Sequence, residues 1–227
     1  MTYVMSDLHG HKARYDAILE KIGFSGNNRM YIIGDVVDRG NQPVALAREI
    51  MGQENVTCLM GNHELMCLQA MHPDTTGPEV LENWFYNGGE ITRDQLNLLP
   101  AAERDAILDW MHCLPDQVEV EAGGKKFLLV HGAPADTLYR RVWSRPDPRT
   151  FEPVQGTTVI VGHTPVNNFH APENPEGYFI KQAILGRHLR VYHGDGFMGI
   201  DCGLAYRDTT VSALACARLD DMTEFYA

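Results

Sequence analysis

The sequence predicts an α/β fold, and three features of its 227 residues lead to this prediction. Short apolar runs of strand type recur along the chain, and each ends in a polar cluster. Helical spacing of apolar residues fills the intervals between the early runs, while strand patterns dominate the later part. Alternating strands and helices are typical of α/β domains, and we expect a single domain over residues 1–227.

The N-terminal part predicts three strands separated by two helices. The strands are the apolar starts of TYVMSDLHG (residues 2–10), MYIIGDVVDRG (30–40) and VTCLMGNHE (56–64). The first helix is predicted by apolar residues spaced i, i+3, i+4 and i+7, which are Tyr15, Ile18, Leu19 and Ile22. Gly23 is suited to end this helix, and Pro43 is suited to begin the second one.

The later part predicts a hairpin and three further strands. QVEVEAGGKKFLLVHG (117–132) reads as two strands that turn at Gly123 and Gly124, because paired glycines favour a primed hairpin turn. Further strands are expected in TVIVGHTP (158–165), GIDCG (199–203) and TVSALACARL (210–219).

The segment from Phe169 to Gly199 is the least regular part of the pattern. FHAPENPEGY (169–178) predicts a surface loop, and residues 179–193 predict a hairpin that turns at Gly186 and Arg187. This segment is either a surface element that contributes to substrate selectivity or a plain surface hairpin.

Composition and charge restrict the partners of the protein. A net charge of -11 argues against a general nucleic-acid surface. No apolar run approaches the roughly 20 residues that a membrane span needs, and the N-terminus lacks the pattern of a signal peptide. The five cysteines are scattered and form no C-x-x-C, which fits reduced thiols. We therefore expect a cytoplasmic protein that binds neither nucleic acid nor membrane. We also expect a monomer, although no sequence pattern determines the oligomeric state.

Side chains suited to divalent metal ions follow the strand-like runs. The expected ligands are Asp7, His9, Asp35, Asn62, His131 and His163. The first three are expected to hold one ion and the last three a second ion, with Asp35 bridging both through its two carboxylate oxygens. Carboxylate, imidazole and amide ligands suit Mn best, with Fe or Zn as alternatives. Each histidine alone would read as a core residue, but three at separate strand ends favour ligation.

The same motifs contain residues for phosphate hydrolysis. Two metal ions lower the pKa of a shared water toward about 7, so the sequence predicts attack of a metal-bound hydroxide on phosphorus. His63 is the expected general acid for the leaving alkoxide, and Asp38 is expected to orient it. Arg39 offers a guanidinium fork that suits phosphate oxygens, and we expect Asn62 to contact the phosphate as well. Taken alone, Asp35, Asp38 and Arg39 would read as a helix cap with a surface ion pair.

These motifs resemble the ordered signature of the metallophosphoesterases: SDLHG (6–10), GDVVDRG (34–40), GNHE (61–64), HGA (131–133) and GHTP (162–165). More narrowly, they are similar to the PPP-type serine/threonine protein phosphatases, especially the bacterial and phage-lambda-type members. NWFYNGG (83–89), VWSR (142–145) and IDCG (200–203) extend the resemblance over nearly the whole chain. Ser6 and Ala133 stand where the family commonly has glycine, and neither replaces a ligand.

The resemblance implies a four-layer αββα fold, in which a central β-sandwich is flanked by helices and carries two metals. It also implies a second phosphate-binding arginine, for which Arg145 is the matching position. His11 is expected to open a helix rather than to approach the metals. Trp84 is expected to pack in the core, and Asp201 to be a residue at a strand end.

The leading expectation for function is hydrolysis of phosphoserine and phosphothreonine, and also of phosphotyrosine, in proteins or peptides. It depends partly on Glu64, because the related symmetrical dinucleoside-tetraphosphate hydrolases more often carry Asp there. Such a hydrolase, or another small-molecule phosphoesterase, is the alternative enzyme. A metal-stabilised binding module is a third reading, but such a module has no need for the general acid His63.

Overall fold

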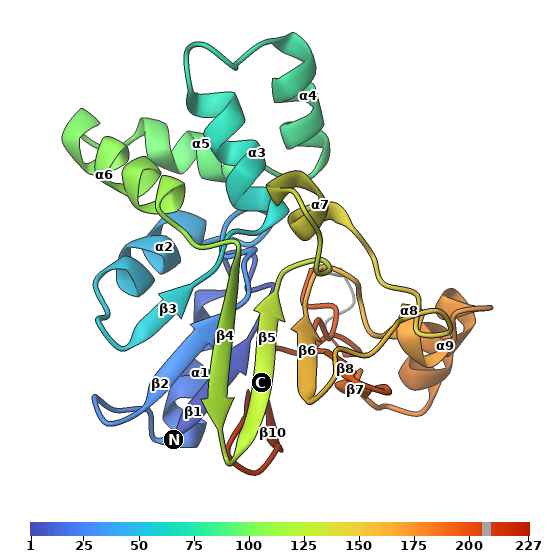
Figure 1. Cartoon of the computed structure of the whole chain (residues 1–227). Helices are drawn as coiled ribbons and strands as arrows, with labels where there is room; N and C mark the ends of the chain where they lie inside the picture. The colour runs from blue at the N-terminus through green and yellow to red at the C-terminus, as the bar shows by residue number, and fades with distance from the viewer. Residues whose placement is uncertain (206–209) are drawn as a thin grey trace.

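The structure is a computed structural model that describes residues 1–205 and 210–227. Two five-stranded mixed sheets face each other, and helices flank them (Figure 1). This is the layered α/β arrangement that the resemblance implies. Among the described residues, no helix has the length and apolar character to cross a membrane.

The first sheet contains three parallel strands and an antiparallel C-terminal pair. Its order is β10 (Thr223–Tyr226), β9 (Ala215–Arg218), β1 (Thr2–Met5), β2 (Arg29–Ile32) and β3 (Val56–Cys58). Of the strand predicted over residues 210–219, only Ala215–Arg218 adopts strand structure.

The second sheet also has three parallel strands in the middle. Its order is β4 (Gln117–Ala122), β5 (Lys125–Val130), β6 (Thr157–Val161), β8 (Phe197–Gly199) and β7 (Tyr192–His193). The predicted hairpin joins β4 to β5, and both turn glycines have positive φ angles, 56° for Gly123 and 75° for Gly124.

The helices of the described chain connect the strands and cover the sheets. They are α1 (Lys12–Ile22), α2 (Pro43–Met51), α3 (Asn62–Met71), α4 (Pro78–Tyr86), α5 (Glu90–Asn97), α6 (Ala101–His112), α7 (Leu138–Trp143), α8 (Asn167–His170) and α9 (Pro175–Ile184). The predicted ends of the first two helices are confirmed: Gly23 adopts the left-handed conformation after α1, and Pro43 is the first residue of α2.

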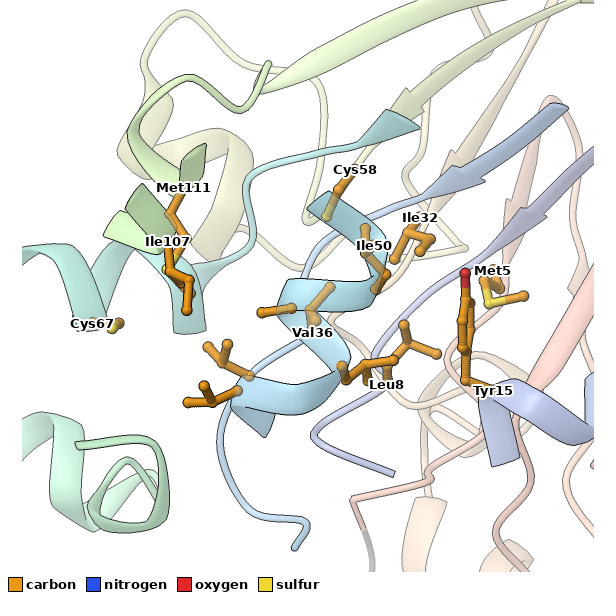
Figure 2. Close-up of a cluster of buried hydrophobic side chains, with 14 of the residues drawn as sticks. Met5, Leu8, Tyr15, Ile32, Val36, Ile50, Cys58, Cys67, Ile107 and Met111 are labelled. Atoms are coloured by element: carbon orange, nitrogen blue, oxygen red, sulfur yellow. The ribbon is translucent and has the colours of Figure 1, made fainter. Parts of the chain in front are cut away.

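Strand alternation divides the apolar side chains between two cores. Tyr3 and Met5 of β1 pack with α1 and α2 in the first core, which also contains Tyr15 and Ile50 (Figure 2). Val4, on the opposite face of β1, belongs to the second core, which contains residues of both sheets. The sandwich is thus anchored on both faces of β1, directly before the first polar motif.

The predictions of a loop over residues 169–178 and of a hairpin over 179–193 were wrong. This stretch contains the end of α8 and the whole of α9, and β7 begins only at Tyr192. Pro175 is the first residue of α9 rather than a loop proline, and the Asn174 side chain accepts a 3.0 Å hydrogen bond from the Gly177 amide as its N-cap. Phe169 anchors α8 against Phe197 of β8, with ring centroids 5.4 Å apart.

Candidate active site

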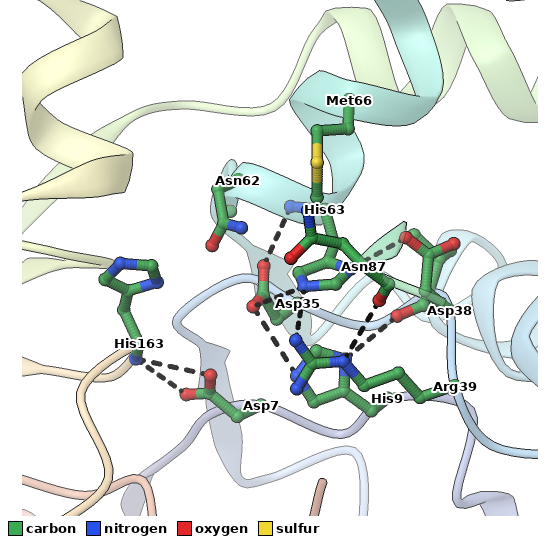
Figure 3. A network of polar contacts seen from close by, with 12 residues as sticks. Asp7, His9, Asp35, Asp38, Arg39, Asn62, His63, Met66, Asn87 and His163 are labelled. Carbon is green, nitrogen blue, oxygen red and sulfur yellow. Dashed lines mark hydrogen bonds and ion pairs between the residues drawn. The ribbon is translucent and has the colours of Figure 1, made fainter. Parts of the chain in front are cut away.

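All six parallel strands end at one edge of the sandwich, and a polar residue follows each of them. The strands are β1, β2, β3, β5, β6 and β8, and the residues are Asp7, Asp35, Asn62, His131, His163 and Asp201. Because the carboxyl ends of parallel strands lie together, side chains from six distant parts of the sequence meet here. Figure 3 shows four of them, Asp7, Asp35, Asn62 and His163.

The backbone at this edge is strained. Among the described residues, seven other than glycine have positive φ angles, and six of these are predicted site residues. The six are Asp7, His9, Asp35, Asp38, Arg39 and His163. Such conformations are unfavourable for residues with a Cβ atom and cluster at functional sites.

Close backbone packing fixes the position of Asp35. A Cβ atom added to Gly61 would lie 2.3 Å from Oδ1 of Asp35, so only glycine fits at the start of α3. The Asp35 carboxylate also accepts a 3.1 Å hydrogen bond from the amide of His63. The loops after β2 and β3 therefore form one unit.

Two groups of buried side chains have the spacing of metal ligands. One consists of His9, Asp35 and His63, and the other of Asp35, His131 and His163. Within each group the potential ligand atoms lie within 4.8 Å of one another, and Asp35 belongs to both groups. The arrangement places the expected bridging carboxylate between two sets of imidazoles.

Hydrogen bonds to the backbone orient the imidazoles. Nδ1 of His131 donates to the carbonyl of Ile33 at 2.7 Å, and Nδ1 of His9 contacts the carbonyl of Val37 at 3.2 Å. Because a carbonyl oxygen only accepts, Nδ1 of each ring serves as a donor and Nε2 is the nitrogen available to a metal ion. Nε2 lies 3.6 Å from Asp35 in His9, and in His131 it lies 3.3 Å from Asp35 and 3.0 Å from Oδ1 of Asn62. Burial alone would lower the pKa of His131, but the nearby Asp35 carboxylate outweighs it and raises that pKa to about 10, so a metal ion would bind there in place of a proton.

His163 supplies the most direct indication of a ligand. Its Nε2 is a buried side-chain nitrogen without a hydrogen-bond partner among the described residues. A buried nitrogen of this kind is costly unless something binds it. Together with Asp35 and His131, this nitrogen fits a divalent metal ion.

The charges of the site also fit a cation. Burial, aided by the nearby Asp201, raises the pKa of Asp7 well above its usual value. Burial lowers the pKa of His9, and it lowers the pKa of His163 to about 2, so both imidazoles are neutral. Burial would raise the pKa of Asp35, but the nearby imidazoles of His131 and His63 outweigh it and hold that pKa low.

Asp7 is held by two neighbours. Its carboxylate accepts hydrogen bonds from the amide of His163, at 3.0 and 3.2 Å, and from the hydroxyl of Ser6 at 2.5 Å. Ser6, one of the two residues that depart from the family motifs, thus orients an expected ligand. A Cβ atom on Gly162 would lie 2.0 Å from the Ser6 hydroxyl, so the glycine of GHTP leaves room for it.

His63 and Asp38 form a buried pair beside the metal groups. Nδ1 of His63 donates to Asp38 at 2.7 Å, and its Nε2 lies 3.2 Å from a guanidinium nitrogen of Arg39 (Figure 3). Trp84 and Thr92 donate to the same carboxylate at 2.9 and 2.6 Å. Sequence reasoning assigned Trp84 to core packing and did not identify Thr92, because α4 and α5 lie far from Asp38 along the chain.

Two arginines reach the same cavity. Arg39 donates to the carbonyl of Asn87 at 3.2 Å, and Arg145 donates to the carbonyl of His163 at 2.8 Å. The cavity between them has a volume of about 130 Å³ and is lined by Asp7, His9, Asp35, Asn62, His63, His163 and Asp201 among others. A larger apolar groove of about 750 Å³, between α3, α6 and the start of α7, contains none of the predicted site residues. The small cavity is therefore the chemical site.

Glu64 lies behind the site rather than in it. Its buried carboxylate accepts hydrogen bonds from the amides of Asp35, Val36, Val37 and Gly61 at 2.8 to 3.2 Å. It fixes the loops and does not line the cavity. Neither a Glu nor an Asp side chain at this position would therefore contact the substrate directly.

Asp201, which the sequence predicted only as a residue at a strand end, also belongs to the site. It is 5% exposed, lines the cavity and accepts a 2.8 Å hydrogen bond from the Gly203 amide. The sequence pattern could have identified Asp201 as a site residue, since GIDCG (199–203) repeats the pattern of an apolar strand followed by an acidic residue. His11, in contrast, is the residue before α1 and lies outside both metal groups, as expected.

Known proteins resemble this chain in sequence and in fold. Two curated relatives are the symmetrical bis(5'-nucleosyl)-tetraphosphatases of Paracidovorax citrulli and Acidovorax ebreus, 31% and 33% identical over 132 residues. Each match covers 57% of this chain and 42% of the relative, so less than half of each relative's length is matched.

Solved structures share the fold at low sequence identity. A metallophosphoesterase from Sphaerobacter thermophilus has a TM-score of 0.57 at 16% identity, covering 100% of this chain and 87% of the other. A protein serine/threonine phosphatase from Saccharomyces cerevisiae has a TM-score of 0.60 at 14% identity, covering 95% and 71%.

The model of the calcineurin-like phosphoesterase family matches residues 2–198. This match includes both metal groups, the buried His63–Asp38 pair and both arginines. Because it spans most of the sequence, the chain belongs to the calcineurin-like phosphoesterase family.

Proposed function

We propose that this phosphoesterase hydrolyses symmetrical dinucleoside tetraphosphates. The observation that carries the proposal is the identity of 31–33% to curated tetraphosphatases over 132 residues. That stretch is long enough to include several of the polar motifs rather than one of them. The proposed substrate differs from the phosphoprotein that the motifs alone favoured.

Two divalent ions, with Mn the expected metal, are proposed to bind the six expected ligands. Asp7, His9 and Asp35 would hold one ion, and Asn62, His131 and His163 the other, with Asp35 shared. Asp201 is close enough to Asp7 to raise its pKa, and it adds negative charge at the same edge. When bound, the metals supply Lewis acidity toward water and toward the phosphate.

The residues around the metals position one phosphate group. Arg39 and Arg145 present guanidinium groups to a cavity of about 130 Å³, and Asn62 lies on its wall. This volume suits a phosphate and falls below the roughly 300 Å³ at which pockets for drug-sized ligands begin. The rest of any substrate would lie outside the cavity.

His63 is proposed to protonate the leaving oxygen. Asp38 holds Nδ1 of His63, so Nε2 is the nitrogen that faces the cavity. Arg39 contacts Nε2, and a bound phosphate that attracts Arg39 would free this nitrogen. Hydrolysis of a dinucleoside tetraphosphate releases a nucleoside diphosphate, whose phosphate oxygen is a far weaker base than an alkoxide. This reaction depends less on the proton donor than phosphoserine hydrolysis does.

The His63–Asp38 pair is the observation that favours a second candidate, a phosphoprotein phosphatase. A buried carboxylate that orients an imidazole toward the cavity is most useful when the leaving group is a serine or threonine alkoxide, which needs a proton. A cavity of about 130 Å³ that holds only the phosphate is also compatible with a protein substrate.

A direct comparison of substrates separates the two candidates. With added Mn, kcat/KM would be measured for diadenosine tetraphosphate and for a phosphoserine peptide. We expect at least a tenfold preference for the dinucleotide, with two molecules of nucleoside diphosphate as products. A preference for the peptide would replace the first proposal with the second.

The variant His63→Asn tests the proton donor. We expect its rate on phosphoserine to fall roughly 100-fold or more, in line with the usual contribution of general acid catalysis. The loss on p-nitrophenyl phosphate should be much smaller, since nitrophenolate needs little protonation. Equal losses on both substrates would show that His63 acts otherwise, for example as a metal ligand.

A further inference from the structure

Two exposed tyrosines lie next to residues that line the catalytic cavity. They are Tyr86 at the end of α4, which is 92% exposed, and Tyr139 at the start of α7, which is 64% exposed. We propose that Tyr86 and Tyr139 are specificity-determining residues that stack on the nucleobases of a dinucleoside polyphosphate. This inference rests on the proposed function.

The size of the cavity requires binding groups outside it. About 130 Å³ accommodates a phosphate but not a nucleoside. The two nucleosides of a dinucleoside tetraphosphate would therefore lie on the surface around the mouth. Their recognition depends on side chains that are exposed and adjacent to the phosphate site.

Tyr139 extends the wall of the cavity along α7. Trp143 lines the cavity and packs edge-on against His163, with ring centroids 5.9 Å apart. Tyr139, one helical turn earlier, lies on the same face with its ring centroid 6.1 Å from that of Trp143. The two rings form a continuous aromatic strip from the metal groups to the surface.

Tyr86 has a corresponding position on α4. Its neighbour Asn87 lines the cavity, and the Asn87 carbonyl accepts the hydrogen bond from Arg39. Asn83, Tyr86 and Asn87 are spaced i, i+3 and i+4, so they share one face of the helix end. Figure 3 shows Asn87 beside Arg39, and Figure 1 shows α4 and α7 at the same end of the molecule. A ring is thus available on each of two helices that border the phosphate site.

Stacking suits the chemistry of this substrate. Aromatic side chains bind bases face to face regardless of base identity, because every base has a π-face. No hydrogen bond within the described chain holds the phenol of either tyrosine. A single exposed apolar residue elsewhere, such as Leu98 at 85% exposure, needs no such explanation. The position beside the cavity distinguishes the two tyrosines.

Kinetics of four variants test the inference. Tyr86→Ala and Tyr139→Ala should each raise KM for diadenosine tetraphosphate at least about fivefold, with a smaller change in kcat. The ratio of kcat/KM for the dinucleotide to that for glycerol phosphate, which has no ring, should fall by the same factor. Tyr139→Phe keeps the stacking ring and should keep the ratio, and Leu98→Ala is the control for an exposed apolar residue away from the cavity. An unchanged ratio in both alanine variants would overturn the inference.

Inhibition separates this inference from the proposed function. With glycerol phosphate as substrate and fixed free metal, the Ki of ATP should be lower than that of inorganic tripolyphosphate, and Tyr139→Ala should remove much of the difference. If the protein does not hydrolyse the dinucleotide but shows this pattern, the proposed function fails and the tyrosine sites stand. Equal inhibition by both compounds in the unmodified protein would show that no base is bound.

Discussion

Individual residues of the site adopt backbone conformations that local preference opposes. Six predicted site residues have φ angles between 42° and 71°. The loops are held in these conformations by the packing of Gly61 against Asp35 and by the hydrogen bonds to Glu64. The consequence is that side chains from adjacent positions, such as Asp38 and Arg39, point toward one cavity.

Substitution of Arg39 measures this strain. Its φ angle is 66°, a conformation that costs an L-residue about 1 kcal/mol or more but costs glycine little. Arg39→Gly should therefore have a free energy of unfolding about 1 kcal/mol higher than Arg39→Ala, measured by urea denaturation. The helical Arg48 in α2 is the matched control, because there alanine should be the more stable by a similar amount. If the glycine and alanine variants ranked in the same order of stability at both positions, the backbone strain at Arg39 would be contradicted.

Thr92 tests how Asp38 is held. Its hydroxyl donates to Asp38 at 2.6 Å and accepts from the Asp38 amide at 2.9 Å, and the residue is buried. Thr92→Val keeps the shape but removes both bonds, so we expect a loss of about 2 kcal/mol in the free energy of unfolding. Hydrolysis of phosphoserine should slow more than that of p-nitrophenyl phosphate. Thr92→Ser retains the hydroxyl and should recover most of both losses.

At the scale of elements, α3 organises the site through its first turn. Asn62 and His63 are its first two residues, and Glu64 reaches back to the loop after β2. Four backbone amides donate to the Glu64 carboxylate, which joins the ends of β2 and β3. The start of one helix thereby sets both the ligand loop and the proton donor.

Removal of Glu64 should therefore affect folding before it affects chemistry. Glu64→Ala leaves four buried amides without an acceptor, and we expect it to lower the free energy of unfolding by about 3 kcal/mol. Glu82→Ala on the exposed face of α4 is the control and should change stability by less than about 0.5 kcal/mol. Chemical denaturation of both variants measures the difference, and equal stabilities would refute a structural role for Glu64.

At the scale of the whole molecule, the site joins the two sheets. The first metal group comes from loops of the first sheet and α3, while His131 and His163 follow strands of the second sheet. Ions bound across this edge would connect both halves of the sandwich. Metal binding should therefore stabilise the complete fold.

Thermal unfolding with and without Mn tests this coupling. At 100 times the dissociation constant, binding adds about 2.7 kcal/mol, which corresponds to a rise in Tm of roughly 5–10 °C for a chain of this size. His163→Ala should show at most half of the rise, because it removes the unpaired Nε2. A Tm that does not respond to Mn in the unmodified protein would exclude a folded metal site.

The two sheets are also connected through an outermost strand of each. His193 of β7 and Glu224 of β10 lie 2.6 Å apart. Burial alone would raise the pKa of Glu224, but hydrogen bonds from His193 and Tyr226 outweigh it and lower the pKa. A lowered pKa means that the stabilisation is present above pH 4.5 and is lost as the pH falls toward the folded value.

Glu224→Gln should remove this pH dependence. Between pH 4.5 and 3, the free energy of unfolding of the unmodified protein should decrease more steeply than that of the variant, and the two slopes should agree above pH 6. Denaturant titrations at each pH measure both slopes. A variant as steep as the unmodified protein in acid would mean that Glu224 does not contribute.

The sequence by itself determined the α/β class, the first two helices and the hairpin at Gly123–Gly124. These features depend on local patterns: apolar periodicity, a proline that begins a helix, and glycines that turn the chain. It also determined which loops carry the polar motifs, because parallel strands that end in polar residues must bring those residues to one edge. The family of metal-dependent phosphoesterases followed from the order of these motifs.

Only the tertiary structure decided which other residues complete the site. Trp84 and Thr92 are 46 and 54 positions from Asp38, and no local pattern connects them to its carboxylate. The positive φ angles and the position of Glu64 behind the cavity likewise depend on packing. The physical reason is that hydrogen bonds and burial act through space, whereas sequence patterns report only on neighbours along the chain.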